Sequence, residues 1–342
     1  MKIKFLNDLP LSLAYGGKEQ QMIDYFNSLE KNGHDISMFD VNNLNEFDDL
    51  DILHLFGEGG LISDVIKFIK INNIKVKIIV SPSFYRRPYY FYKVLKVLEK
   101  FKIPTWYRYK KNIYEDSDSI IVNSEIEKEY LLKIFNINKN NIKVIYNKVD
   151  LNITNKKHLK DFEFKNFFLC VTHLNERKNI LNLLAAQKLI FEKHNIKLIL
   201  VGKNRFDKIS NHQKFLKIIK NNSSVKYIPG LDKNINEDYN KLQYLFRNCM
   251  FHILPSHVES PGISSLEAIS FSKKILVGDF SIVKEYFNDE ASYCKFGIHE
   301  IYNAINLMLN ENHFNDKKYS SELLNKISLK NLSFDLNKVY SE

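Results

Sequence analysis

The stretch MFHILPSHVESPGISSLE, residues 250–267, gives the strongest indication of the fold. It begins with an apolar run, Met250 to Leu254, which is typical of a buried strand. Pro261 predicts the first turn of a helix, because the N–H that proline lacks has no intrahelical partner there, and Ser260 is the expected N-cap. Gly262 leaves the backbone open, so N–H groups at the positive end of this helix can approach an anion. The stretch therefore predicts a strand, a loop and a helix that form a phosphate site.

Two carboxylates, Glu259 and Glu267, bracket this predicted anion site. A carboxylate accepts hydrogen bonds and repels phosphate oxygens, so it suits sugar hydroxyls better than phosphate. An anion site between two hydroxyl-binding acids describes a nucleotide-sugar site. The alternative is a chance arrangement, because two glutamates around a helix start occur in many chains.

The rest of the chain repeats the alternation of short apolar runs with amphipathic stretches of helical length. Strands are expected in two series, 3–6, 52–55, 76–80, 119–122 and 143–145, then 168–171, 197–201, 225–228, 251–254 and 274–277. Apolar runs of this length between helices are typical of parallel sheets covered on both faces. The pattern predicts an α/β protein with two doubly wound, Rossmann-like domains.

A chain of 342 residues is long enough for two such domains. The boundary is expected in the polar, Lys/Asn-rich stretch 151–160. We therefore predict an N-terminal domain at 1–155, a C-terminal domain at 156–316, and a helical segment at 317–342 that packs back on the first domain.

Composition and cysteine usage exclude several classes of protein. The apolar fraction of 44% and the aromatic fraction of 13% argue against disorder. Cys170, Cys249 and Cys294 stand singly in apolar surroundings, which predicts buried thiols in a reducing cytoplasm and no disulfide framework. No apolar run approaches the length of a membrane span. Residues 1–6 are expected to form a first strand and not a signal peptide.

Further candidate sites follow other predicted strands, where this fold class presents its ligands. Gly16 and Gly17 open a helix expected to run to about Lys31, and their N–H groups could meet an anion; a plain turn is the alternative. Arg177 and Lys178 lie in a strand-to-helix loop and could neutralise a diphosphate, or could simply be solvated.

Glycines close two more predicted strands, at Gly202 and at Gly230-Leu231. Both positions suit the close backbone approach of a flat base, and each is an ordinary turn if taken alone. Ser124 is expected to cap the helix after 119–122, and Asp150 to order the hinge between the domains.

Taken in order, these residues resemble the retaining glycosyltransferases of family four, of the type that builds bacterial surface polysaccharides. The motifs that carry the resemblance are Gly16-Gly17, Ser124, Asn147-Lys-Val-Asp150, Lys178-Asn179, Gly202, Gly230, Pro255-Ser256, Glu259-x₇-Glu267-Ala268 and Glu285. The resemblance covers about residues 1–300. It implies the GT-B fold, in which two Rossmann-like domains face a cleft and a C-terminal helix returns to the first domain.

The resemblance also implies roles for the matching residues. Glu267 would hold the ribose hydroxyls, Glu259 would face the donor sugar, and Lys178 would offset the phosphate charge as the nucleotide leaves. Glu259 and Lys178 are thus the expected catalytic residues. The expected donor-binding set is Gly16, Gly17, His173, Arg177, Lys178, Gly202, Gly230, Leu231, Gly262, Ile263 and Glu267.

The chain departs from the family pattern at two places that matter for catalysis. His173 stands where the family usually has an arginine, and Arg177 could compensate. The loop 80–84, where many members carry a histidine, has none. His54 is the nearest substitute by position, although a hydrogen-bonded core histidine is the favoured interpretation.

The function implied by the resemblance is a metal-independent hexosyltransferase without a resident cofactor. It would move a hexose from a nucleotide-diphosphate sugar to a lipid-linked or growing surface saccharide, as in lipopolysaccharide. Asp49-Leu-Asp51 and Asp116-Ser-Asp118 match a metal-binding pattern, but both precede apolar strands and are expected to be structural. The alternatives are a non-catalytic GT-B subunit that binds a partner or glycan, and a GT-B phosphorylase or epimerase.

Residues 84–112 contain nine basic side chains and one acid, a net charge of +8 out of +10 for the chain, and many aromatic rings. A helix expected at 89–101 could meet an anionic membrane at the inner face of the cell membrane. The residues expected to contact membrane or acceptor are Arg86, Arg87, Lys93, Lys96 and Lys100. A nucleic-acid surface and a core-packed helix with solvated lysines are the alternatives; we favour membrane and expect no nucleic acid.

Overall fold

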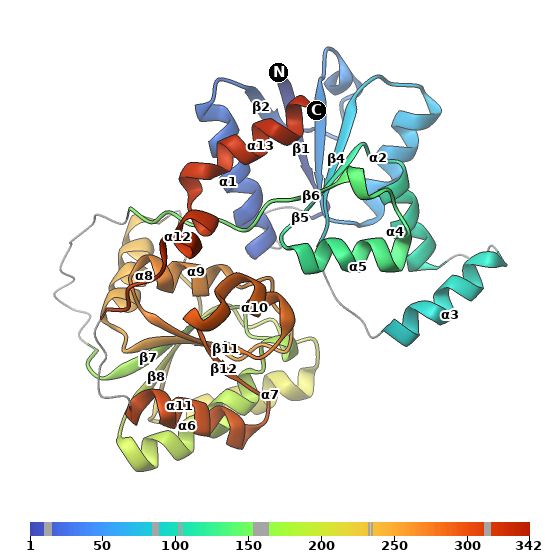
Figure 1. Ribbon diagram of the computed structural model, residues 1–342. Coiled ribbons are helices and arrows are strands. Elements are labelled where there is room, and N and C mark those ends of the chain that lie inside the picture. The colour runs from blue at the N-terminus through green and yellow to red at the C-terminus, as the bar shows by residue number, and fades with distance from the viewer. Residues whose placement is uncertain are drawn as a thin grey trace. The chain divides into compact units, whose positions relative to one another are not determined.

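The structure is a computed structural model that describes residues 1–9, 16–83, 89–101, 103, 105–152, 164–231, 233, 235–310 and 316–342. The chain divides into two compact units (Figure 1). The first unit consists of Met1–Lys148 and Leu329–Glu342, and the second of Val149–Ser328. The chain thus enters the second unit once and returns to the first at its end.

The first unit is a six-stranded parallel sheet in the order β2-β1-β3-β4-β5-β6, with helices on both faces. Its elements are β1 (Lys2–Asn7), α1 (Gly17–Lys31), β2 (Asp35–Met38), η1 (Leu44–Phe47), β3 (Ile52–Phe56), α2 (Gly60–Ile71), β4 (Lys77–Ser81), α3 (Tyr89–Lys100), α4 (Trp106–Glu115), β5 (Ser119–Val122), α5 (Glu125–Phe135), η2 (Lys139–Asn141), β6 (Ile142–Val144), η5 (Leu329–Asn331) and α13 (Leu332–Ser341).

The second unit is also a six-stranded parallel sheet, in the order β12-β11-β10-β7-β8-β9. Its elements are β7 (Phe167–Val171), η3 (Glu176–Lys178), α6 (Ile180–His194), β8 (Lys197–Val201), α7 (Ile209–Lys220), β9 (Val225–Ile228), α8 (Asn236–Asn248), β10 (Phe251–Leu254), α9 (Ile263–Ser270), β11 (Lys274–Gly278), α10 (Ser281–Phe287), η4 (Asn288–Glu290), β12 (Ser292–Cys294), α11 (Ile298–Asn310) and α12 (Ser321–Ile327). The α/β prediction of two Rossmann-like domains is confirmed.

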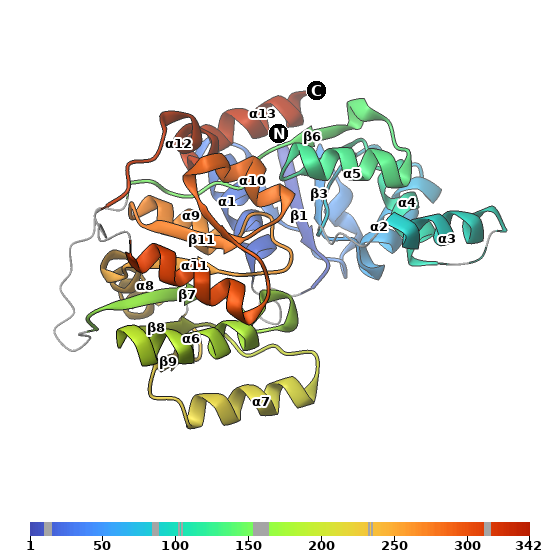
Figure 2. The same cartoon turned by 60° about the horizontal axis from the view of Figure 1, so that its bottom comes forward.

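Alternate residues of the strands feed two separate cores, one on each face of a sheet. In the first unit, Leu53 and Leu55 of β3 pack toward the face covered by α2 and α4. Ile52 and Phe56 point the other way, into the core under α1 and α13. In the second unit, α6 and α11 lie side by side over one face (Figure 2). The three cysteines are buried free thiols, as expected.

Two strands were missed by the sequence pattern, β2 and β12. Both lie at a sheet edge, where one side of the backbone has no strand partner and burial is incomplete. Their sequences, DISM and SYC, therefore lack the apolar run that marks the interior strands. The interior strands lie within one or two residues of the expected ranges.

The segment that returns to the first unit begins at Leu329, later than the expected residue 317. The helix α12 belongs to the second unit, where Lys326 donates to the carbonyl of Glu285 at 3.0 Å. The N–H of Val149 donates to the carbonyl of Ile327 at 2.7 Å, so the outgoing and returning chain segments pair inside the second unit. This pairing also places the first boundary at Lys148–Val149 and not at residue 155.

The histidine His54 fixes the returning helix α13 to the sheet of the first unit. It is fully buried on β3, and its Nδ1 hydrogen-bonds to the hydroxyl of Tyr340 on α13. Its Nε2 lies 2.8 Å from Ser81 Oγ on β4. Both ring nitrogens are thus used in the core, which makes His54 a structural residue and not a substitute for the missing histidine of loop 80–84.

A second fully buried histidine, His252 on β10, has no hydrogen-bond partner at either ring nitrogen within the described residues. Burial lowers the pKa of both His54 and His252 to about 3. In the unfolded chain the pKa of a histidine is near 6.5. Between about pH 6.5 and 3, these two histidines are therefore protonated in the unfolded chain but not in the folded chain. Stability is therefore lost as the pH falls, by about 1.4 kcal/mol per pH unit for each histidine.

We expect His54→Leu and His252→Leu to differ in their cost to stability at neutral pH but to change its pH dependence in the same way. At pH 7.5, His54→Leu should cost about 2–3 kcal/mol because Ser81 and Tyr340 lose their partner, whereas His252→Leu should cost little. Both variants should reduce the steepness of the loss between pH 6.5 and 4.5. The measurement is the free energy of unfolding in urea across this pH range, and unchanged steepness in both would contradict the account.

Candidate active site

The carboxyl ends of four neighbouring strands of the second unit carry the expected donor-site residues. Since β10, β7, β8 and β9 are adjacent and parallel, the loops that follow them meet at the carboxyl-end edge of the sheet, called the donor edge below. The residues that lie in these loops or the adjoining first helical turns are His173, Arg177 and Lys178 after β7, Gly202 after β8, Gly230 and Leu231 after β9, and Glu259, Gly262, Ile263 and Glu267 after β10.

The two expected catalytic residues, Lys178 and Glu259, form a buried ion pair that joins the loops after β7 and β10. Lys178 Nζ contacts Glu259 Oε2, with about a tenth of each side chain exposed, 10% and 12%. Lys178 ends the short helix η3, whose first turn is capped by Asn175 Oδ1 accepting from the Lys178 N–H at 3.1 Å. This cap holds the lysine at the sheet edge.

The electrostatics of the pair favour an ionised carboxylate. Burial acts to raise the pKa of Glu259, but the nearby cations Lys178 and Arg177 more than offset it and leave the pKa below its usual range. Burial and the neighbouring Arg177 lower the pKa of Lys178, and the Glu259 carboxylate opposes that shift. Arg177 thus adds positive potential here, although His173 occupies the position where the family has its arginine.

The helix α9 begins at Ile263, two residues later than expected. Gly262 is its N-cap and adopts φ +96°, which a helix cannot include, so Pro261 and Ser260 lie before the helix and Ser260 is not the cap. A Cβ at Gly262 would lie 2.6 Å from Leu254 Cδ2 and 3.0 Å from Glu259 Cγ. The glycine therefore lets Glu259 lie against the backbone next to the free N–H groups at the start of α9.

Gly202 and Gly230 allow close backbone approach at the ends of β8 and β9. Gly202 has φ +151°, and a Cβ there would lie 1.7 Å from the carbonyl oxygen of Thr172. Gly230 has φ +118° and faces the side chain of Lys203. The loops after β7 and β8 are thus packed backbone to backbone, which fixes their relative position.

Glu267 forms a second ion pair, which the sequence pattern did not indicate. Its Oε1 contacts the ammonium of Lys233, a residue in the connection between β9 and α8. The two side chains are 16% and 25% exposed, so this pair is more open to solvent than the pair of Lys178 and Glu259.

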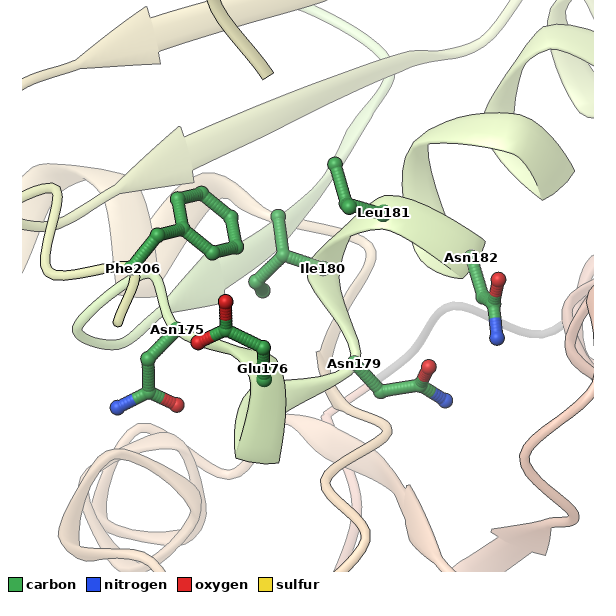
Figure 3. A pocket seen from close by; sticks show the side chains of 7 residues that line it. All are labelled: Asn175, Glu176, Asn179, Ile180, Leu181, Asn182 and Phe206. Carbon is green, nitrogen blue, oxygen red and sulfur yellow. The ribbon is translucent and has the colours of Figure 1, made fainter. Parts of the chain in front are cut away.

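A small pocket of about 180 Å³ lies beside the start of α6 (Figure 3). Its lining residues are Asn175, Glu176, Asn179, Ile180, Leu181, Asn182 and Phe206. It includes neither Lys178 nor Glu259 and is smaller than typical ligand sites. The carboxylate of Glu176 accepts from the N–H groups of Asp207 and Lys208 and from Asn211 Nδ2.

These hydrogen bonds give Glu176 a structural role. Burial acts to raise its pKa, but the bonds from Asn211, Asp207 and Lys208 lower it to about 2. Glu176 is therefore ionised at neutral pH and ties the loop after β8 to η3. It supports the loop that carries Lys178.

In the first unit, Gly16 and Gly17 stand at the start of α1 as expected, with Gly16 as the N-cap. Beside them, Lys18 forms an ion pair with Asp8, which directly follows β1. The loop after β3 adds Glu58, whose carboxylate accepts from Lys110 Nζ and from the hydroxyl of Tyr114. These acids were missed, although the glycine-rich run 57–60 after a predicted strand could have indicated Glu58.

The described residues of the basic aromatic segment, 84–112, differ in burial. Tyr92 and Tyr107 are buried, and Trp106 stacks on Phe91 at 6.0 Å between ring centroids. These four rings therefore pack in or against the core and not on an exposed face. The exposed apolar residues are instead Val94, Val97, Phe101 and Ile103.

The lysines of α3 also differ from one another. Lys93 and Lys100 are exposed, whereas Lys96 donates to the carbonyl of Lys133 at 3.0 Å. Glu99, the acid of this segment, pairs with Lys111 at 2.7 Å. Arg86 and Arg87 lie outside the described residues.

One aspartate of each Asp-x-Asp motif accepts a hydrogen bond from the backbone. Asp51 accepts from the N–H of Lys2, and Asp118 from the N–H of Ile78. Within the described ranges, no group of three or more His, Cys, Asp or Glu side chains could hold a metal ion. No helix among the described residues is long and apolar enough to cross a membrane.

Two Rossmann-like units, each built on a six-stranded parallel sheet, define a GT-B glycosyltransferase fold. The family described as "Glycosyl transferases group 1" matches residues 152–322, and "Glycosyltransferase Family 4" matches residues 37–153. The chain belongs to the group 1 glycosyl transferases.

A curated relative, the O-antigen chain mannosyltransferase RfbU of Salmonella typhimurium, is 24% identical over 166 residues. The match covers 48% of this chain and 43% of the relative, so the chain spans less than half of the relative's length.

Solved structures share the fold over the whole chain at low identity. Sucrose-phosphate synthase from Thermosynechococcus elongatus has a TM-score of 0.73 at 14% identity, with 100% of this chain and 98% of that chain covered. Anabaena HepE in complex with UDP and glucose has a TM-score of 0.67 at 15% identity, with 100% and 99% covered. The lipopolysaccharide outer core galactosyltransferase WaaB has a TM-score of 0.63 at 15% identity, with 99% of each chain covered.

Proposed function

We propose that this glycosyltransferase is a retaining, metal-independent hexosyltransferase. It transfers a hexose from a nucleotide-diphosphate sugar to a lipid-linked or growing surface saccharide. The observation that carries the proposal is the buried pair of Lys178 and Glu259 beside the open N–H groups at Gly262 and Ile263. Cation, carboxylate and helix terminus together suit a sugar joined to a diphosphate.

In the proposed reaction, a hydroxyl oxygen of the acceptor forms a bond to the anomeric carbon of the donor sugar. The bond from that carbon to the diphosphate oxygen breaks on the same face, and the acceptor proton passes to the departing diphosphate. Lys178 and the N–H groups at Gly262 and Ile263 offset the charge that develops on the diphosphate. Glu259 holds hydroxyls of the donor sugar, and Glu267 holds those of the ribose.

The relatives support the substrate class. One is named as a mannosyltransferase of the O-antigen chain, one as a galactosyltransferase of the lipopolysaccharide outer core, and one holds UDP and glucose. These relatives favour a hexose, a nucleoside diphosphate and a surface saccharide for this chain as well. The sequence departures at His173 and at loop 80–84 favour the second candidate, a GT-B subunit that binds its ligand without turnover.

A panel of nucleoside diphosphates and their sugars tests the proposal by thermal shift and calorimetry. Because a ligand that binds only the folded state raises its apparent stability, one member of a UDP, GDP and ADP series should raise the melting temperature. Release of the diphosphate from the matching sugar separates the enzyme from the non-catalytic subunit. Failure of every member to bind would refute the transferase and leave the subunit that binds a partner or glycan.

We place the protein in the cytoplasm, peripherally on the inner face of the membrane, with α3 as its contact. Val94, Val97 and Phe101 recur at helical spacing and form one exposed stripe, in which Phe101 is 73% exposed. Lys93 and Lys100 flank the stripe, and Lys111 neutralises Glu99. An apolar stripe beside exposed lysines suits an anionic lipid surface.

Neutralising these flanking lysines should weaken membrane binding. Each cation near an anionic surface contributes about 1 kcal/mol, so Lys93→Gln/Lys100→Gln should lower the partition coefficient by about tenfold or more. The measurement is co-sedimentation with vesicles of phosphatidylglycerol and phosphatidylcholine. Lys67→Gln/Lys70→Gln on α2 removes the same charge and should have a much smaller effect. Equal losses in both pairs, or steep salt-dependent binding to DNA or RNA instead, would contradict the membrane assignment.

A further inference from the structure

The ion pair between Glu267 and Lys233 closes the carboxylate that the proposed function assigns to the ribose. Glu267 lies on α9, in the helix whose start forms the donor site, and Lys233 comes from the connection between β9 and α8. The ammonium contacts Oε1, one of the two oxygens that would accept the ribose hydroxyls. Ribose and Lys233 therefore need the same carboxylate.

The partial exposure of this ion pair allows another group to displace one of its members. A quarter of the Lys233 side chain and 16% of the Glu267 side chain are exposed, so water and salt screen their attraction. The pair of Lys178 and Glu259 is about 10% exposed on both sides and loses more on opening. Of the two lysine–glutamate pairs at the donor edge, that of Lys233 is the one a neutral hydroxyl group can displace more readily.

We propose that Lys233 is a latch on Glu267: its ammonium occupies the carboxylate in the free protein and is displaced by the ribose hydroxyls of the donor nucleotide. The proposal rests on the proposed function, because it needs Glu267 to bind ribose. The latch keeps the carboxylate paired when the site is empty and lowers the affinity gained from the ribose hydroxyls. Lys233 is thus a specificity-determining residue of the donor site that does not bind the donor.

A comparison of two ligands isolates the latch. The probes are the nucleoside diphosphate identified by the panel and its 2′,3′-dideoxy analogue, which keeps the base and both phosphates. The dissociation constant of the dideoxy analogue divided by that of the nucleoside diphosphate measures the gain from the ribose hydroxyls alone. The effects of salt on phosphate binding are common to both ligands and cancel in this ratio. Calorimetry at 20 mM and 300 mM salt gives this ratio for wild type, Lys233→Met and the control Lys241→Met.

In the wild type, the ratio should rise about threefold between the two salt concentrations, because salt weakens the latch. In Lys233→Met it should already be about threefold above the wild type at 20 mM salt, and it should not change with salt. Lys241→Met, which removes the lysine that pairs with Glu237 on α8, should behave as the wild type. Lys233→Gln, a second neutral side chain, should repeat the result of Lys233→Met.

The contradicting outcomes are distinct. An unchanged ratio in both Lys233 variants would refute the latch and leave donor binding intact. Equal weakening of the ribose and dideoxy ligands would instead make Lys233 a phosphate ligand and also refute it. If no nucleoside diphosphate binds the wild type, the proposed function itself fails.

Discussion

Lys178→Met is expected to lower the rate of sugar transfer by about a hundred- to a thousandfold, the loss typical for one group that stabilises a developing negative charge. The lysine is held at the donor edge by the Asn175 cap and by its contact with Glu259. Its removal deprives the departing diphosphate of a fixed cation. The measurement is release of nucleoside diphosphate from the donor sugar at saturating acceptor.

The same substitution should also destabilise the second unit, by about 3 kcal/mol, since it leaves Glu259 buried without its main counter-charge. The pKa of Glu259 should rise for the same reason. Lys178→Met/Glu259→Gln removes both charges and should recover most of this stability without recovering the rate. Lys188→Met on α6, an exposed lysine of the same unit, should change neither quantity. Full turnover by Lys178→Met, or recovery of turnover by the double variant, would contradict the assigned role.

Gly202→Ala is expected to disrupt the donor edge more severely than any other glycine-to-alanine change at these loops. The new Cβ would lie 1.7 Å from the backbone oxygen of Thr172, at a φ of +151° that alanine disfavours. We expect a loss of about 4 kcal/mol or more in the free energy of unfolding, with loss of nucleotide binding.

Gly33→Ala provides the matched control for this effect. Gly33 also has a positive φ, +79°, but a Cβ there would have no heavy atom within 4 Å. Gly33→Ala should therefore lower the free energy of unfolding only by the cost of a positive φ for alanine, about 1 kcal/mol, and leave nucleotide binding unchanged. Urea unfolding followed by circular dichroism compares the two. Similar costs at both glycines would show that the loops after β7 and β8 are not packed backbone to backbone.

The sequence predicted the two sheets well because their interior strands are buried on both faces and carry uninterrupted apolar runs. It missed β2 and β12 because an edge strand needs no such run. It also located the loops that follow β8, β9 and β10, because Gly202, Gly230 and Gly262 adopt positive φ, which few other residues tolerate. The same property of Gly262 moved the start of α9 beyond Pro261.

Pairings between distant loops could not be predicted from local patterns. The contacts of Lys233 with Glu267 and of Lys110 with Glu58 join segments far apart in the chain, and neither lysine lies in a recognisable motif. The sequence correctly favoured a core histidine at position 54, but its partner Tyr340 could not be predicted, because only the return of α13 brings Tyr340 to β3. The composition of residues 84–112 also did not tell which aromatic rings pack inward, as Tyr92 and Tyr107 do.

In the proposed function, the loops after β7 and β10 bind and cleave a nucleotide-diphosphate sugar. The most direct measurement is release of UDP, GDP or ADP from a panel of their hexose conjugates, by wild type and by Lys178→Met side by side. The account predicts release from one member of the panel by the wild type and at least a hundredfold less by the variant. No release from any member, or equal release by the two proteins, would contradict it.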